Sequence, residues 1–300
     1  MLTLKSYRNS KAVLLIMKSG LYLTVLFLIC FLTYKLAWSQ PYQAANVTSP
    51  SIAFNTIQQD DINVHYAYAG DTEKPGVIFV HGTPGDWAAF EAYLLSKTLR
   101  DDFFVVSVDR PGWGKSQTQD KKLNGVFDHQ ARSVKAIFDH YPNKKWIVVG
   151  HSLGASLAPQ IALESQASVS GMVLLAGSLK PRLGNPRWYN YAASTWLVSK
   201  MIGDTMTRAN REVMKLRKQL KLMNESLEDN KLDIHVVIVQ GLKDKLVSPK
   251  NPAFANQQWQ DNFASLEIVE LEEAGHFLPW DNPHHVLKSI FDVANKVNQQ

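Results

Sequence analysis

The chain of 300 residues contains a single cysteine, Cys30, so no disulfide can form within it. Cys30 lies in an apolar run near the N-terminus, and the later part of the chain therefore offers no thiol as a nucleophile or metal ligand. Stability has to come from a hydrophobic core, for which a hydrophobic share of 45% is ample. The composition predicts a globular protein of one or two domains.

Acidic residues are missing from the first 59 positions, although basic residues are frequent there. Four basic residues precede the uncharged run of residues 19–34, namely Lys5, Arg8, Lys11 and Lys18. Extended to Trp38, this run is about long enough for a helix that crosses ~30 Å of hydrocarbon. Positive charge before the run places the N-terminus in the cytoplasm. We therefore expect residues 1–38 to form a basic stub and a single-pass membrane anchor, with the following domain extracytoplasmic.

A cleaved signal peptide is the alternative interpretation of this segment, with a cut after Ser39 and a secreted product. The apolar run exceeds the roughly 7 to 15 residues usual for a signal peptide, which favours the anchor. Residues 39–51 carry two prolines and no charge, as expected for a linker. The folded domain is then expected over residues 52–300.

Motifs for nucleotides and metals are also missing. The Gly-Lys-Ser run at residues 114–116 resembles the end of a phosphate-binding loop, but Asp109 stands where that loop needs its first glycine. No H-E-x-x-H sequence is present, and the neighbouring His284 and His285 lack the third and fourth ligands of a metal site. We therefore expect neither a metal nor another cofactor.

Short β-type runs recur along the domain and are separated by stretches long enough for helices. They cover residues 52–57, 62–68, 77–80, 103–108, 146–149, 172–175, 234–239 and 266–271. The first two alternate apolar and polar residues, whereas most later runs are continuously apolar, which is typical of strands buried on both faces. Helical periodicity is found at residues 87–99, 127–140 and 283–297. The alternation predicts an α/β fold with a mostly parallel eight-stranded sheet and helices on both faces.

Residues 178–232 interrupt this alternation, because no strand-like run occurs there. Apolar residues recur at spacings of three and four, as in one amphipathic helix: Met206, Ala209, Val213, Leu216, Leu220, Met223 and Leu227. Basic residues outnumber acidic ones in this segment. Charge opposite an apolar stripe is usual for a surface helix, so we expect a solvated face and no nucleic-acid partner. The segment is predicted to be a helical lid.

The Gly-His-Ser-Leu-Gly run at residues 150–154 has the G-x-S-x-G form of a nucleophile elbow, in which glycines let a strand turn sharply into a helix. The pattern alone is weak, since a serine at such a junction is often a helix N-cap. Its context agrees, because a strand is predicted before it and a helix after it, with a kink at Pro159. Ser152 is the candidate nucleophile, and the backbone N–H of Leu153 is a candidate oxyanion donor.

Three other loops carry the groups that a serine nucleophile requires. Asp244 and His276 each follow a predicted strand, and Thr83 lies in the sequence His-Gly-Thr-Pro-Gly after another. The proline after Thr83 favours an extended backbone that leaves the Thr83 N–H free for a ligand. Each loop alone could be an ordinary turn. Their order along the chain, serine, then aspartate, then histidine, matches one catalytic arrangement.

These residues resemble the α/β-hydrolase superfamily over residues 52–297. The likeness is carried by the motifs HGTPG at 81–85, DRPGWGKS at 109–116, GHSLG at 150–154, GLKDKLVSP at 241–249 and AGHFLPWDNP at 274–283. It is nearest to the lidded branch of esterases, epoxide hydrolases and carbon–carbon-bond hydrolases. Epoxide hydrolases and dehalogenases of this branch carry aspartate at the nucleophile position, so Ser152 argues against both of these activities.

The resemblance implies a serine hydrolase that cleaves an ester, thioester or related acyl bond without a cofactor. Ser152, His276 and Asp244 would form the triad, with Thr83 and Leu153 at the oxyanion hole. Aromatic residues at the start of the lid suggest an apolar acyl substrate: Trp188, Tyr189, Tyr191 and Trp196. Acyl transfer and a small-molecule receptor that keeps the triad remain alternatives. The sequence leaves the substrate and the oligomeric state open.

Overall fold

The computed structural model describes residues 52–59, 62–116 and 120–299. These residues belong to one compact unit, residues 50–300. The predicted anchor at residues 1–38 and the linker at 39–51 lie outside the described residues. Within the described ranges, no helix is both long and apolar enough to cross a membrane.

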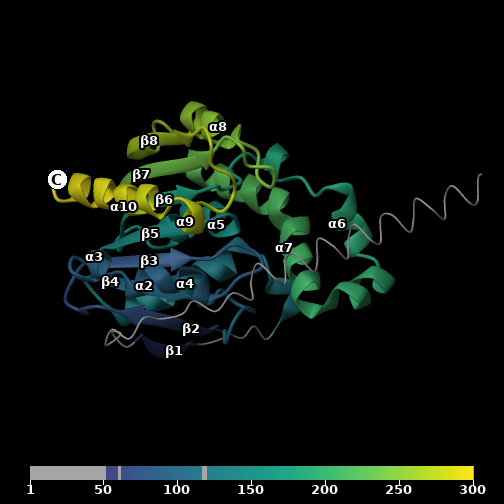
Figure 1. Cartoon of the computed structure of the whole chain (residues 1–300), viewed down its shortest axis with the longest axis horizontal. Coiled ribbons are helices and arrows are strands. Elements are labelled where there is room, and N and C mark those ends of the chain that lie inside the picture. The colour runs from purple at the N-terminus through teal and green to yellow at the C-terminus, as the bar shows by residue number, and fades with distance from the viewer. Residues whose placement is uncertain (1–51, 60–61, 117–119, 300) are drawn as a thin grey trace, which may run out of the picture. The chain divides into compact units, whose positions relative to one another are not determined.

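An eight-stranded sheet forms the centre of this unit, in the order β1-β2-β4-β3-β5-β6-β7-β8 (Figure 1). The strands are β1 Ala53–Gln59, β2 Ile62–Ala69, β3 Gly76–Val80, β4 Phe104–Val108, β5 Trp146–His151, β6 Val169–Leu175, β7 Leu232–Gly241 and β8 Phe263–Leu271. β2 pairs antiparallel with β1 and β4, and all other pairs are parallel. The predicted mostly parallel eight-stranded sheet is confirmed.

The central strands are covered on both faces. Every residue of β3, β4 and β5 is buried, which explains why these strands are mostly apolar. β3 pairs in parallel with both β4 and β5, so the three strands end at the same edge of the sheet. Loops at this edge are therefore brought together although they are far apart in the sequence.

Helices cover both faces of the sheet, as predicted. The helices and 3-10 turns of the α/β core are η1 Trp87–Phe90, α2 Glu91–Leu95, α3 Lys97–Arg100, η2 Lys121–Leu123, α4 Phe127–His140, α5 Leu153–Glu164, α8 Asn251–Gln258, α9 Leu278–Asp281 and α10 Pro283–Val297. α4 and α5 pack in one hydrophobic core around Trp146, whereas α2, α3 and α10 pack in a second core around Phe79. The helix expected at 87–99 is broken, because Ser96 is extended and caps α3. α5 runs through Pro159 to Glu164 as one helix.

The lid at residues 178–232 is helical, as predicted, and comprises η3 Pro181–Gly184, α6 Trp188–Ala193 and α7 Trp196–Glu228. Leu220, Met223 and Leu227 of α7 are buried in the same hydrophobic core as α4 and α5. Gly203, with a φ of 77°, interrupts the helical conformation of α7. The part of the lid before Gly203 projects away from the sheet (Figure 1).

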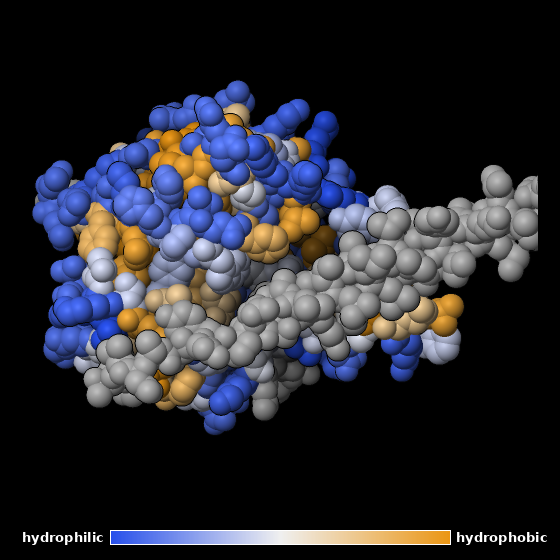
Figure 2. All heavy atoms as spheres, viewed as in Figure 1, coloured by the Kyte–Doolittle hydropathy of each residue, from blue (hydrophilic) through white to orange (hydrophobic). Residues whose placement is uncertain are grey.

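The lid aromatics are at the surface. Trp188 is 75% exposed and Trp196 is 76% exposed, and Figure 2 shows apolar side chains at the surface of this projecting region. In this structure they therefore do not enclose an acyl pocket. Trp188 lies in α6 and Trp196 begins α7, so both belong to the part of the lid before Gly203.

Trp146 provides a test of the core. Its side chain is fully buried beside Phe138 and Phe104. Trp146→Ala leaves a large cavity and should lower the free energy of unfolding by about 3–5 kcal/mol. Chemical denaturation measures this loss. Trp188→Ala is the matched control, since the exposed side chain should change stability by no more than about 0.5 kcal/mol. Equal losses for the two variants would contradict this packing.

Candidate active site

Ser152 stands at a sharp turn between β5 and α5. Its backbone has φ 55° and ψ −117°, and its side chain makes no capping hydrogen bond to α5. A non-glycine residue in this conformation costs of order 1–3 kcal/mol. Ser152 therefore occupies the position of a helix cap without acting as one, and its hydroxyl remains available for chemistry.

The two glycines of the elbow are required by close backbone packing. A Cβ atom on Gly154 would lie 2.0 Å from the carbonyl oxygen of Val80, and one on Gly150 would lie 2.4 Å from the carbonyl oxygen of Gly154. Any side chain at either position would push α5 away from β3 and β5. The glycine spacing thus sets the position of Ser152 next to the loop that follows β3.

Asp244 and His276 form a buried pair in the loops after β7 and β8. The distance from Asp244 Oδ2 to His276 Nδ1 is 2.7 Å, and the exposed fractions of these residues are 6% and 8%. Asp244 Oδ1 also accepts the backbone N–H groups of Leu246 and Val247, at 2.8 and 2.9 Å. Burial raises the pKa of Asp244, but its hydrogen bonds outweigh burial and hold the pKa below its ordinary value. The ionised carboxylate fixes Nδ1 of His276 as the protonated nitrogen and leaves Nε2 to accept a proton.

His151, next to Ser152, connects the elbow to His276. Its Nε2 lies 2.9 Å from the carbonyl oxygen of His276, and the two rings are 4.9 Å apart. Burial and the neighbouring His276 lower the pKa of His151 to about 3. His151 is therefore neutral and holds the His276 loop through a hydrogen bond. It occupies a variable position of the G-x-S-x-G pattern, so no sequence motif indicates this role.

The structure shows no hydrogen bond between the side chains of Ser152 and His276 among the described residues. Free enzymes often form this bond only when substrate is bound. Ser152 and His276 are held near each other because His276 contacts His151, the residue before Ser152. The four predicted loops, after β3, β5, β7 and β8, thus meet at one edge of the sheet.

The loop after β3 lies directly against the serine. A Cβ atom on Gly82 would be 3.0 Å from Cβ of Ser152. In the part of the chain that the structure describes, neither the Thr83 N–H nor the Leu153 N–H donates to a protein acceptor. Leu153 is the first residue of α5, where an N–H has no partner within the helix and carries the positive end of its dipole. Both candidate oxyanion donors are therefore free beside Ser152.

The sequence at residues 109–116 builds a turn around a buried carboxylate. Asp109 accepts hydrogen bonds from the backbone N–H of Trp87 and of Lys115, both at 2.8 Å, and contacts His65 Nδ1 at 2.8 Å. Gly114 has a φ of 51°, and a Cβ atom there would lie 2.1 Å from the Asp109 carboxylate. The Gly-Lys-Ser run at residues 114–116, which resembles the end of a phosphate-binding loop, is therefore part of a structural turn.

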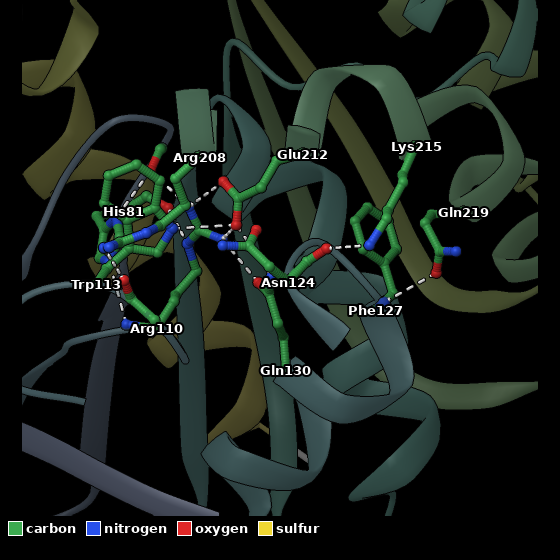
Figure 3. A network of polar contacts seen from close by, with 12 residues as sticks. His81, Arg110, Trp113, Asn124, Phe127, Gln130, Arg208, Glu212, Lys215 and Gln219 are labelled. Carbon is green, nitrogen blue, oxygen red and sulfur yellow. Dashed lines mark hydrogen bonds and ion pairs between the residues drawn. The ribbon is translucent and has the colours of Figure 1, made fainter. Parts of the chain in front are cut away.

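A buried network that no sequence motif indicates lies beside the loop after β3, which carries the candidate oxyanion donor Thr83 (Figure 3). It joins Arg110 to Glu212 of the lid helix α7, with His81, Trp113 and Gln130 around them. Arg110 belongs to the DRPGWGKS motif at residues 109–116, but its partner Glu212 is 102 positions away in the sequence. No spacing pattern could reveal this pairing. The described residues contain no group of three or more His, Cys, Asp or Glu side chains arranged to hold a metal ion.

Comparison with known proteins agrees with this architecture. A family model described as alpha/beta hydrolase fold matches residues 75–200. The uncharacterised hydrolase YugF of Bacillus subtilis (strain 168) is 29% identical over 121 residues, 40% of this chain and 42% of that protein. Epoxide hydrolase 4 of Homo sapiens is 25% identical over 128 residues, 42% of this chain and 35% of that protein. The chain therefore matches less than half the length of these relatives.

A solved structure is similar over most of its length. A putative aryl esterase from Burkholderia cenocepacia aligns with a TM-score of 0.67 and 16% identity, covering 83% of this chain and 100% of that one. At this identity the likeness establishes the fold.

The strained backbone of Ser152 gives a stability test. Ser152→Gly should be more stable than Ser152→Ala by about 1 kcal/mol, because glycine adopts a positive φ without strain. Ser156, the fourth residue of α5, is the control. There the glycine variant should be about 1 kcal/mol less stable than the alanine variant. Urea denaturation of the four variants measures both differences, and the same sign at both positions would argue against strain at Ser152.

Proposed function

We propose that this chain, which belongs to the α/β-hydrolase fold superfamily, is a serine hydrolase that cleaves an ester, thioester or related acyl bond. The observation that carries the proposal is the buried Asp244–His276 pair, at 2.7 Å, in loops beside the elbow of Ser152. The pair leaves one imidazole nitrogen to act as a base. The free N–H groups of Thr83 and Leu153 provide an oxyanion site on the other side of the serine.

In the proposed reaction, Ser152 Oγ attacks the acyl carbonyl while Nε2 of His276 takes the hydroxyl proton. Asp244 stabilises the imidazolium that forms. The Thr83 and Leu153 N–H groups bind the oxyanion of the tetrahedral intermediate. His276 then gives its proton to the leaving group, and an acyl-enzyme results. Water, activated by His276, attacks the acyl-enzyme in the same way and releases the acid and Ser152.

Several relatives are named epoxide hydrolases, and the nucleophile decides between that activity and acyl hydrolysis. Ser152 occupies the elbow in this chain, and a serine needs a base and an oxyanion site to attack a carbonyl. His276 is the candidate base, and the Thr83 and Leu153 N–H groups are the candidate oxyanion donors. This supports acyl hydrolysis over epoxide opening.

An apolar acyl substrate is supported by side chains near the triad. Leu246 is 55% exposed, Phe277 is 51% exposed and Trp280 is 43% exposed. Leu246 follows Asp244, Phe277 follows His276, and Trp280 packs edge-on against His151 at 5.2 Å between ring centroids. These residues would contact the acyl chain of a small-molecule substrate.

The length and low charge of residues 19–38 support a further proposal, that the domain is tethered to a membrane on its outer side.

Ser152→Ala tests the proposed nucleophile. The variant should lose turnover of short p-nitrophenyl esters by about 10⁴-fold or more, because no acyl-enzyme can form. Far-ultraviolet circular dichroism and the unfolding midpoint should stay at their wild-type values. The wild-type protein is assayed in parallel with a styrene-type epoxide, which it should not hydrolyse. Ester turnover by Ser152→Ala at the wild-type rate would contradict the proposal.

Asp244→Asn tests the orientation of the base. The amide cannot fix the Nδ1-protonated form of His276, so kcat should fall by about 10⁴-fold with the fold intact. Glu273→Gln is the matched control, because Glu273 is an exposed carboxylate on the same loop as His276, and its kcat should not change. Similar kcat values for the two variants would remove Asp244 from the triad.

The two alternatives to hydrolysis are separated by the products. An acyltransferase would divert the acyl group to an added alcohol in place of water. A small-molecule receptor would bind without multiple turnovers. Ester hydrolysis to free acid over many turnovers, unchanged by added alcohol, is the result that we expect.

A further inference from the structure

The peptide group between Gly82 and Thr83 links the candidate oxyanion site to the protein interior. Its N–H is the Thr83 donor, and its C=O is the Gly82 carbonyl. In a planar trans peptide these two groups point in opposite directions. Any contact that fixes the Gly82 carbonyl therefore also fixes the direction of the Thr83 N–H.

Two buried donors hold the Gly82 carbonyl. Arg110 Nη2 and His81 Nδ1 both lie 2.7 Å from its oxygen. Arg110 Nε also donates to the carbonyl of His81 at 2.9 Å, and the backbone N–H of Arg110 donates to His81 Nε2 at 3.1 Å. Burial, together with the charge of Arg110, lowers the pKa of His81 well below its ordinary value. Neutral His81 can thus accept at Nε2 while it donates from Nδ1.

Arg110 is in turn fixed by the lid. Its Nη1 and Nη2 atoms lie 2.9 and 3.1 Å from the two carboxylate oxygens of Glu212 in α7, and Nη1 also donates to Gln130 at 2.7 Å. Arginine has five N–H donors, and each of them has an acceptor here. Arg110 and Glu212 are 0% and 1% exposed. The guanidinium therefore has one orientation, set by Glu212 and by the Gly82 carbonyl. Figure 3 shows Arg110 next to Glu212 and Gln130.

The segment before α4 leaves space for α7 to come close to Arg110. Gly125 has a φ of 74°, and a Cβ atom there would lie 2.9 Å from Cα of Glu212. One helical turn further on, Lys215 donates to the carbonyl of Asn124. Two turns further on, Gln219 accepts the N–H of Phe127. Burial raises the pKa of Glu212, but Arg110 outweighs it and the pKa lies below its ordinary value. The carboxylate is therefore ionised at neutral pH.

We propose that Arg110 and Glu212 are a positioning pair that directs the Thr83 N–H at the oxyanion and couples it to lid helix α7. The proposal rests on the proposed serine-hydrolase function. Arg110 does not touch the substrate, and it acts through the Gly82 carbonyl. Glu212 makes the orientation of a catalytic donor depend on where the lid helix sits.

The test uses the full chain with both charges replaced by apolar residues, Arg110→Met together with Glu212→Leu. Replacing a buried ion pair by apolar residues of similar volume is often neutral for stability, so this variant should fold. Loss of a whole oxyanion donor lowers kcat by about 100- to 1000-fold. A misdirected donor should cost about 10- to 100-fold in kcat for p-nitrophenyl esters, with KM unchanged.

A second readout separates positioning from a structural role. A trifluoromethyl ketone forms a tetrahedral adduct with a serine nucleophile and uses the oxyanion site, whereas a ground-state ester analogue does not. The affinity for the ketone should fall by the same factor as kcat/KM in Arg110→Met with Glu212→Leu, and the affinity for the analogue should not change. The control is Lys135→Met with Asp139→Leu, an exposed ion pair on α4, which should leave both affinities unchanged.

Glu212→Gln tests the contribution of Glu212 alone. It is used in place of Arg110→Met with Glu212→Leu if the double variant does not fold. It keeps the size of the side chain but removes the charge that holds Arg110, so kcat should fall, and Glu212→Asp should recover part of it. Wild-type kcat and wild-type ketone affinity in a folded variant would overturn the proposal. If Ser152→Ala is inactive while these variants are fully active, only the positioning proposal fails. If Ser152→Ala is active, the serine-hydrolase proposal fails first.

Discussion

Burial of the central strands on both faces is the constraint on which the rest of the structure depends. Strands covered on both faces lie in apolar surroundings, where a polar side chain is costly unless it has a hydrogen-bond partner. Functional groups are confined to the loops at the ends of the strands. Because β3, β5, β7 and β8 share one parallel sheet, their following loops meet at one edge. Thr83, Ser152, Asp244 and His276 come together for this reason.

Two buried polar clusters at this edge have different tasks. In the proposed reaction the Asp244–His276 pair prepares a base, and its two members lie in the loops after the neighbouring strands β7 and β8. The Arg110–Glu212 pair lies behind the oxyanion loop, with one partner in the lid. Charges this deeply buried are costly unless every hydrogen-bonding group is satisfied, and Arg110 meets that condition. The part of α7 that carries Glu212 thus contacts the candidate site through Arg110, whereas the projecting part before Gly203 carries exposed apolar residues.

Much of the fold and of the candidate site could be predicted, because both depend on local patterns. Continuous apolar runs indicated the buried strands, and the elbow glycines are visible at residues 150 and 154. The break at Ser96, the kink at Gly203 and the exposure of Trp196 could not be predicted, since tertiary packing decides them. The pairing of Arg110 with Glu212 was equally hidden. It joins residues 102 positions apart through side-chain geometry that leaves no periodic signal.

The central claim is that Ser152 is a nucleophile activated by His276, and covalent labelling tests it most directly. The full chain is treated with a fluorophosphonate, digested and examined by mass spectrometry. We expect one stoichiometric adduct on Ser152, formed about 100-fold more slowly in His276→Ala, because the alkoxide cannot form without its base. Absence of an adduct, or an adduct on another residue with Ser152 unmodified, would contradict the account.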